Sequence, residues 1–182
     1  MKRKTAKEIL VDSFRELANQ KSIDKITVKD IVTNCDYSPA TFYRHFSDKY
    51  DLIAWDYFKR TEFIVSNVGK NNCPWRQAFI DGIKYCRDNK DYLKNLFLHT
   101  SGLESFIRYM VEIHMKNIST YILRKFKLEK LDEKTELCLR IYCYGFSELL
   151  CEWILEKNKL SLEEMVEIFE ISIPDPLKKF LF

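Results

Sequence analysis

A cluster of hydroxyl-bearing and cationic side chains follows a helix start at Ser38-Pro39. Serine is a good N-cap, and proline suits the first helical position, where its missing N–H costs nothing. In the helix that follows, Phe42 and Phe46 lie four residues apart and are expected to share the buried side. The residues left pointing wholly or partly outward are Ala40, Thr41, Tyr43, Arg44 and His45. These side chains suit a DNA major groove, where phosphates and base edges need hydrogen-bond donors.

A second short helix is predicted just before this one. Thr27 followed by Asp30 is typical of a capping box, so this helix begins at Val28. Its inward face carries apolar residues at helical spacing, namely Val28, Ile31 and Val32. The helix ends near Cys35, and Asp36-Tyr37 forms the turn. The stretch from Thr27 to Leu52 is thus expected to hold two short helices, a tight turn and the start of a third helix.

An amphipathic helix from Thr5 to Asn19 completes a three-helix unit. Its apolar positions recur at steps of three and four residues: Ala6, Leu10, Phe14, Leu17 and Ala18. Ahead of it, Lys2-Arg3-Lys4 is either an arm that reaches phosphates or a minor groove, or a solvated basic terminus.

The stretch from Thr27 to Leu52, with the helix before it, resembles the DNA-binding domain of the TetR/AcrR family of transcriptional regulators. The family signature has a Ser at the end of the turn, Thr-(Leu/Phe)-Tyr-x-(His/Tyr)-Phe in the short helix, and a Lys opening the next helix. Here these are Ser38, Thr41 to Phe46, and Lys49. Two glycines usual in the family are Asp36 and Ala40 here. The methyl group of Ala40 could touch a thymine methyl or change which bases are tolerated, so these departures bear on sequence preference.

The resemblance and the side-chain chemistry together assign candidate DNA contacts. The candidate base-edge contacts are Arg44 and Thr41. The candidate phosphate contacts are Tyr43, His45, Thr27 and Lys49. Ser38 is a cap that could also touch phosphate. The structural alternatives are that Ser38 and Thr27 only cap, that His45 packs against Phe42, and that Lys49 is solvated.

Net charge separates the two parts of the chain. Residues 1–50 hold ten cations and seven acids, a net charge of +3, whereas the remaining residues hold twenty of each. This charge distribution is what we expect if the N-terminal part binds a polyanion. The alternative is a purely structural three-helix bundle.

Composition favours an all-α fold. The 182 residues include 46% apolar residues, enough for a sizeable core, and only four glycines and four prolines, which argues for long helices.

Six cysteines in a chain of this size, mostly within helical apolar runs, favour free thiols in a reducing cytoplasm. Ile141 to Leu155 is the longest apolar candidate for a membrane span, and Glu148 and Glu152 interrupt it.

The expected domains are residues 1–50, the helix-turn-helix unit, and residues 51–182, a helical regulatory and dimerisation domain. A long helix opening at Ser47-Asp48 and running to Gly69 would connect them. Further helices are expected over Trp75 to Asn89, Asp91 to Leu98, and Phe106 to Lys127. Pro174 and Pro176 are expected to end the last helix, and the LKKFLF tail is either a docked strap or frayed.

The last two main helices, Glu133 to Lys157 and Leu162 to Ser172, resemble in length and position the pair that TetR-family regulators use for dimerisation. The first of them is apolar on more than one face, which one small core cannot cover. The alternative is a monomer with a thick core. A two-fold dimer would place two short helices about 34–36 Å apart on a palindromic operator.

The resemblance implies a homodimeric repressor that a small-molecule effector releases from its operator. Alternatives are an activator, or a co-activator gated by a protein partner, and a small helical enzyme. The sequence has no HExxH motif, metal-ligand spacing, phosphate loop or nucleophile motif, so we expect no enzyme activity, metal or cofactor. Side chains that could line an effector pocket are His99, His114, Trp75, Tyr85, Tyr109, Tyr144 and Trp153. For any single one of them an aromatic core is the favoured explanation, so none is assigned as a ligand contact.

Overall fold

The computed structural model describes residues 4–102 and 105–181, and all regular elements in those ranges are helical. The expectation of an all-α fold is confirmed. The α-helices in chain order are α1 (Ala6–Ala18), α2 (Val28–Asn34), α3 (Pro39–Tyr43), α4 (Lys49–Ser66), α5 (Trp75–Asp88), α6 (Lys90–His99), α7 (Phe106–Phe126), α8 (Glu133–Ile154), α9 (Leu162–Ile171) and α10 (Asp175–Leu181), with short 3₁₀ turns η1 (Ile23–Lys25) and η2 (Lys70–Asn72).

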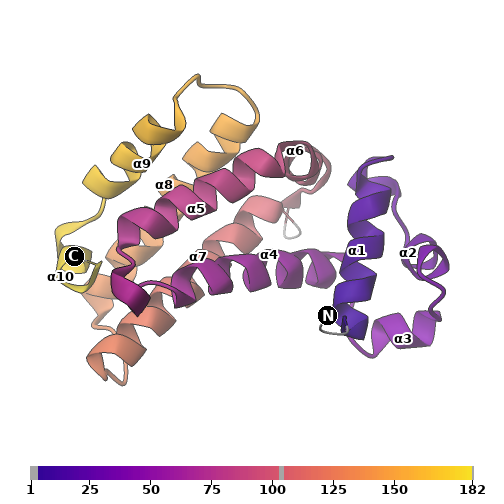
Figure 1. Ribbon diagram of the computed structural model, residues 1–182, viewed down its shortest axis with the longest axis horizontal. Helices are drawn as coiled ribbons and strands as arrows, with labels where there is room; N and C mark the ends of the chain where they lie inside the picture. Colours follow the sequence, from indigo (N-terminus) through magenta and orange to yellow (C-terminus); the bar gives the residue numbers. More distant parts are fainter. Residues whose placement is uncertain (1–3, 103–104, 182) are drawn as a thin grey trace.

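Helices α1, α2 and α3 form one end of the molecule, and α4 leads from them into the remaining helices (Figure 1). Local side-chain caps start each of the three. Thr5 and Thr27 each form a capping box, with Glu8 and Asp30 respectively, and the Ser38 side chain accepts from the Thr41 amide. Their shared core consists of side chains at most 2% exposed: Leu10, Phe14, Ile31, Phe42 and Phe46.

The turn between α2 and α3 places Asp36 in the left-handed region, at φ 55°. Aspartate adopts this conformation at a modest cost, whereas glycine adopts it freely. The predicted turn therefore forms without the glycine that is usual in the family.

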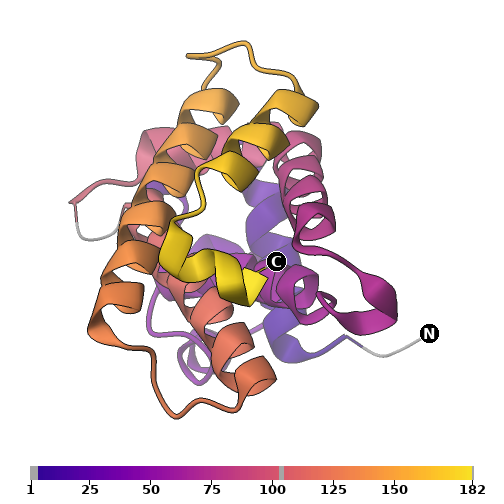
Figure 2. The ribbon, with the colours of Figure 1, turned by 90° about the vertical axis from the view of Figure 1, so that its left-hand side faces the viewer.

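The C-terminal domain is built on the long helices α4, α7 and α8. Helix α4 packs along α7, α7 packs against α8, and α5 packs against α9. Figure 2 shows α8 and α9 side by side at the end of the molecule opposite α1, α2 and α3. The connecting role predicted for the helix that begins near Asp48 is thus taken by α4.

The C-terminal tail forms a helix, α10, that docks on α8. Leu177, Phe180 and Leu181 are buried, and the Phe126 and Phe180 rings pack edge to face with centroids 5.1 Å apart. Of the two alternatives for the tail, the docked one is confirmed. Pro176 lies in the first turn of α10, where a missing N–H is tolerated, so the proline does not prevent the helix.

The structure also bears on three smaller predictions, which concern the cysteines, a membrane span and the basic residues at the N-terminus. All six cysteines are free thiols. No helix within the described ranges has the length and apolar character that a membrane span requires. Lys2 and Arg3 lie outside the described residues, and Lys4 pairs with Asp12 at 2.7 Å on the surface of α1.

Candidate functional site

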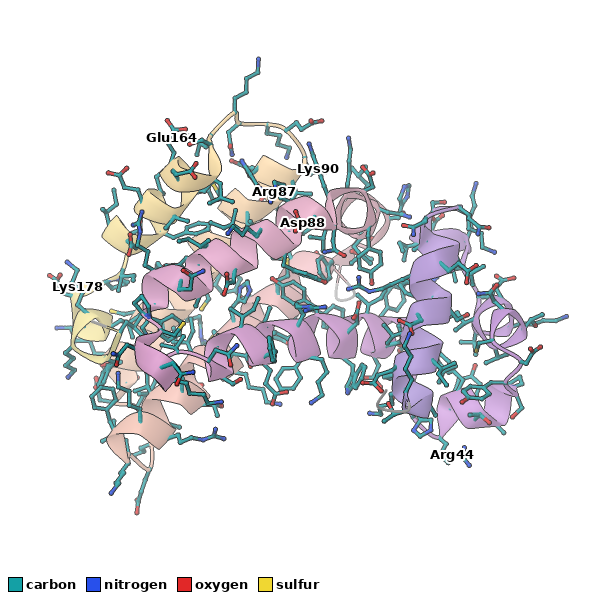
Figure 3. The ribbon with its side chains drawn as sticks, in the orientation of Figure 1. Arg44, Arg87, Asp88, Lys90, Glu164 and Lys178 are labelled. Carbon is teal, nitrogen blue, oxygen red and sulfur yellow. The ribbon has the colours of Figure 1, made fainter. Side chains whose placement is uncertain are left out.

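The outward side of α3 carries the candidate groove contacts. Tyr43 is 60% exposed, Ala40 and Arg44 are exposed, and Thr41 and His45 are half-buried. Figure 3 shows Arg44 projecting from the end of α3, away from the rest of the molecule. The structure brings these side chains together on one helical surface because Phe42 and Phe46 anchor the opposite side in the core.

Ser38 and Thr27 act as helix caps. The Ser38 and Thr41 hydroxyl oxygens lie 3.1 Å apart, and the Ser38 oxygen accepts from the Thr41 amide at 3.2 Å. The Thr27 hydroxyl accepts from the Asp30 amide at 3.1 Å and donates to Asp30 Oδ2 at 2.8 Å. The Thr27 amide, Lys21 and the Thr27 hydroxyl lower the pKa of Asp30 to about 2. Both hydroxyl residues are exposed, so capping leaves them accessible.

Lys49 is bonded to the chain that precedes α2. Its ammonium donates to the carbonyl oxygens of Ile23, Asp24 and Ile26 at 2.9, 3.1 and 3.0 Å. An ammonium has three N–H donors, and these bonds use all three. Lys49 therefore joins the start of α4 to η1, and a contact with phosphate would require the release of one of these carbonyls.

A partly buried cluster joins the helix-turn-helix unit to the C-terminal domain. Arg15 of α1 donates to Asp56 Oδ2 at 2.8 Å, to Asn89 Oδ1 at 3.0 Å and to the Tyr85 hydroxyl at 2.7 Å. Its guanidinium also lies 4.6 Å from the centroid of the Tyr92 ring. We call these five residues the Arg15 cluster. They couple α1 to α4, α5 and α6.

A second polar junction lies beside the Arg15 cluster. The Asn95 amide group of α6 donates to the carbonyls of Ala18 and Lys21 at 2.7 and 3.0 Å, and its oxygen accepts from the Ile23 amide at 3.1 Å. The asparagine thus satisfies backbone groups at the end of α1. Helix α6 and the helix-turn-helix unit are therefore held together by specific bonds.

Sequence reasoning missed the Arg15 cluster, although a signal for it exists. Asp56 lies four residues after Leu52 and three after Ile53, on the apolar side of α4, and Arg15 lies four residues after Val11 on the apolar side of α1. A charged residue at such a position needs a partner because its burial is costly. The sequence pattern therefore indicates that Arg15 and Asp56 each need a partner, but it does not say which residue that partner is.

A cavity of about 70 Å³ lies between α4, α5, α7 and α8. Of the seven side chains considered as pocket candidates, Trp75, Tyr85 and His114 line it. Tyr144 is instead exposed on α8, and Trp153 donates to the Leu160 carbonyl at 2.7 Å. The described residues contain no group of three or more side chains placed to hold a metal ion.

His114 connects three helices next to this cavity. Its Nε2 lies 2.9 Å from the Tyr57 hydroxyl of α4, and its Nδ1 lies 3.1 Å from the Ser147 hydroxyl of α8. Burial lowers the pKa of His114 to about 4, from an ordinary value of 6.5. The imidazole is therefore neutral near pH 7 and serves as a hydrogen-bonding link.

His114 is expected to make the protein less stable in acid. Between pH 6.5 and about 4 the unfolded chain protonates this histidine and the folded chain does not, so lowering the pH favours unfolding. The expected loss in the free energy of unfolding is about 2 to 3 kcal/mol by about pH 4.5. Urea unfolding at about pH 7 and about pH 4.5 measures this loss.

The variant His114→Gln keeps a polar side chain but cannot titrate, so its loss of stability over the same pH interval should be smaller by that amount. His45→Gln, in the turn just after α3, is the matched control and should show the same loss as the wild type. Equal losses in wild type and His114→Gln would show that His114 does not carry this pH dependence.

Two family models match the chain. The model described as "Bacterial regulatory proteins, tetR family" matches residues 10–54, and the model described as "Transcriptional regulator C-terminal region" matches residues 74–175, more than half of the chain. The first covers α2 and α3, and the second covers the helices from α5 to α9.

Individual proteins are similar to the chain at low identity. The HTH-type dhaKLM operon transcriptional activator DhaS of Lactococcus lactis subsp. lactis (strain IL1403) is 21% identical over 99 residues, which span 54% of this chain and about half, 52%, of that relative. A solved structure of the dihydroxyacetone kinase operon activator DhaS superposes with a TM-score of 0.60 at 16% identity, covering 96% of each chain. The TetR family repressor AlkX from Dietzia sp. Strain DQ12-45-1b superposes with a TM-score of 0.57 at 14% identity over the whole of both chains.

Proposed function

Because the chain belongs to the TetR family of DNA-binding transcriptional regulators, we propose that it is a homodimeric repressor that a small-molecule effector releases from a palindromic operator. The observation that carries this proposal is the accessible polar side of α3 at one end of the molecule, opposite a pair of helices with exposed apolar side chains. The domain boundary proposed for this function lies between residues 50 and 51, at the start of α4. The site of action is the cytoplasm, and the role is regulatory rather than enzymatic.

The DNA interface in this proposal is the surface around α3. Arg44 and Thr41 contact base edges, and Ala40 sets which bases fit beside the helix. Tyr43, His45, Thr27 and Ser38 contact phosphates, which fixes the register of α3 in the groove. Lys49 contributes by holding η1 against α4, since its ammonium bonds to three carbonyls there.

The dimer interface in this proposal is formed by α8 and α9. Leu137, Ile141 and Tyr144 are 47%, 72% and 56% exposed and lie at steps of four and three residues, so they form one stripe along α8. Ile171 of α9 is 70% exposed. An apolar stripe of this kind favours packing against the same surface of a second copy, as in a four-helix bundle.

Selection of bound sequences from a random duplex library tests the proposal. The purified chain should enrich an inverted repeat, and its mass in solution should be that of a dimer. Transcription in vitro from a promoter that overlaps the enriched site should fall when the protein is added. Lack of enrichment even at low salt, where phosphate contacts are strongest, would contradict direct operator binding.

Arg44→Ala should weaken binding to the enriched operator at least tenfold. Each arginine contact with a base edge is worth about 1–3 kcal/mol of discrimination, and a dimer has two of them. Discrimination at the contacted base pair should fall at the same time. Fluorescence anisotropy with the operator and single-base variants measures both effects.

Arg87→Ala is the matched control for this experiment. Arg87 is an exposed arginine of α5, remote from α3, and its one described ion pair is with its neighbour Asp88 (Figure 3). Operator affinity should not change in this variant. If Arg44→Ala also bound with unchanged affinity and discrimination, Arg44 would not contact a base.

A second candidate function is an activator or a co-activator gated by a protein partner. Two observations favour it: the similarity to DhaS, which is described as an activator, and the size of the cavity, which is well below the roughly 300–1,000 Å³ of drug-sized ligand pockets. The transcription assay separates the candidates, because an activator raises transcript yield from the enriched site.

A further inference from the structure

A groove of about 1280 Å³ runs along α4, and residues of α1, α7 and η2 also line it. Figure 1 shows α1 standing across the beginning of α4. The groove is larger than the roughly 300–1,000 Å³ of pockets for drug-sized ligands. Several of its side chains, such as Lys59, Phe63 and Arg124, are exposed. Its dimensions therefore suit a segment of a macromolecule better than an enclosed small molecule.

The groove is positively charged, although residues 51–182 as a whole have no net charge. Its lining contains seven Lys or Arg side chains and four Asp or Glu side chains. Each of the four acids already has a partner within the chain, in the pairs Glu8–Thr5, Asp12–Lys4, Asp56–Arg15 and Glu62–Lys59. The acids of the groove therefore leave much of its positive charge uncompensated.

Five exposed cations of the groove take part in no ion pair among residues 4–102 and 105–181, namely Arg60, Lys70, Lys116, Arg124 and Lys125. Lys116 and Arg124 are eight residues apart on α7 and lie on the same side of it, with Thr120 between them. At 1.5 Å per residue, this row is about 12 Å long. It could thus bind carboxylates spread over about two helical turns of a partner.

Aromatic side chains lie among these cations. Phe63 of α4 is 61% exposed, and the ring centroid of Phe58 lies 4.7 Å from Lys116 Nζ. Trp55 lines the groove from the same helix. A partner with apolar side chains of its own would remove Phe63 from water, which is favourable. The groove therefore fits a partner that is both anionic and partly apolar.

Duplex DNA matches this groove less well than a protein segment does. DNA carries one negative charge per about 1.7 Å, so it would also meet the exposed acids Glu8 and Asp12 at the α1 end. A protein segment can place its carboxylates opposite α7 alone and its apolar side chains beside Phe63. An amphipathic helix lying in a groove is a common form of such recognition.

We propose that the groove between α1, α4 and α7 docks an acidic amphipathic helix of a partner protein. Its carboxylates face Lys116 and Arg124, and its apolar side covers Phe63. Among the described residues, the groove shares none with α3 or with the exposed stripe of α8, so neither the proposed operator contact nor the proposed dimer contact uses it. A partner bound there touches the helix-turn-helix unit and the C-terminal domain together, which is the kind of contact that the activator candidate requires.

Selection from a random peptide library displayed on phage, with the full-length chain as bait, tests the proposal. Peptides of about 15 residues are long enough to form a helix. Counter-selection against the double variant Lys116→Glu with Arg124→Glu removes peptides that bind elsewhere on the protein. The enriched peptides should combine acidic residues with leucine or aromatic residues at helical spacing.

The most enriched peptide, labelled with a fluorophore, should bind the double variant on the order of tenfold more weakly than the wild type. Each reversal replaces an attraction by a repulsion, and exposed pairs individually contribute little. Phe63→Ala should also weaken binding because it removes the apolar contact. Added salt should weaken binding to the wild type, since the charges are exposed and screened.

The double variant Lys84→Glu with Lys159→Glu is the matched control. Both lysines are exposed and lie outside the groove, and the change in net charge is the same. The control should bind the peptide with wild-type affinity. Circular dichroism establishes that every variant keeps its helix content.

The proposal would be overturned by a lack of enrichment over the counter-selected variant, by enriched peptides without acidic residues, or by equal affinity for wild type and the Lys116/Arg124 variant. Weaker binding of non-operator DNA to that variant, without peptide enrichment, would also overturn it and would assign the groove to DNA. Operator binding is measured separately with the selected duplex. Its failure would contradict the proposed function and not the docking of an acidic helix.

Discussion

Ile141→Glu is expected to convert the protein into a monomer. Ile141 is 72% exposed in the single chain and lies in the centre of the stripe formed with Leu137 and Tyr144 on α8. In a two-fold interface the substitution places two unpaired carboxylates in an apolar surface, at a cost of several kcal/mol in total. The dissociation constant of the dimer should rise by roughly 100-fold or more, as measured by sedimentation over a concentration series.

The same change should have little effect on the folding of the single chain, about 0.5 kcal/mol or less, because the side chain is exposed there. Operator binding should weaken because two linked half-site contacts become one. Phe63→Glu is the matched control, since Phe63 of α4 is 61% exposed and lies outside the stripe. A dimer of unchanged affinity in Ile141→Glu would show that α8 does not form the interface.

Arg15→Ala is expected to lower the free energy of unfolding by about 3 kcal/mol. It leaves Asp56, whose side chain is 13% exposed, without its cation, and it removes the bonds to Tyr85 and Asn89. Removing one partner of a buried pair costs more than the pair itself contributes, because the other charge remains buried. Urea unfolding near neutral pH measures the loss.

Lys4→Ala, at a residue just before the same helix, is the control for Arg15→Ala. Its ion pair with Asp12 is exposed on both sides, with side chains 66% and 52% exposed, and such pairs contribute little. The double variant Arg15→Met with Asp56→Leu should recover part of the loss because no charge is left unpaired. If Arg15→Ala were as mild as Lys4→Ala, the Arg15 cluster would not hold α1 against the C-terminal domain.

The helix-turn-helix unit could be predicted from the sequence because its determinants are local. The Thr27–Asp30 box, the Ser38-Pro39 start, and Phe42 with Phe46 each act over at most four residues. For the same reason the periodicity of α1 and α4 gave nearly correct helix bounds. The excess of apolar residues on α8 was also visible, although the structure was needed to divide them between the core and the exposed stripe.

The tertiary structure alone decided which distant side chains meet. Arg15 bonds to Tyr85 and Asn89, 70 and 74 residues away, and Lys49 bonds to carbonyls more than 20 residues before it. Such contacts depend on where whole helices cross, and short-range spacing carries no information about that crossing. The sequence by itself thus determined the helices and the polar side of α3. Packing determined the Arg15 cluster, the role of Lys49 and the cavity beside Trp75, because each is formed by side chains from several helices.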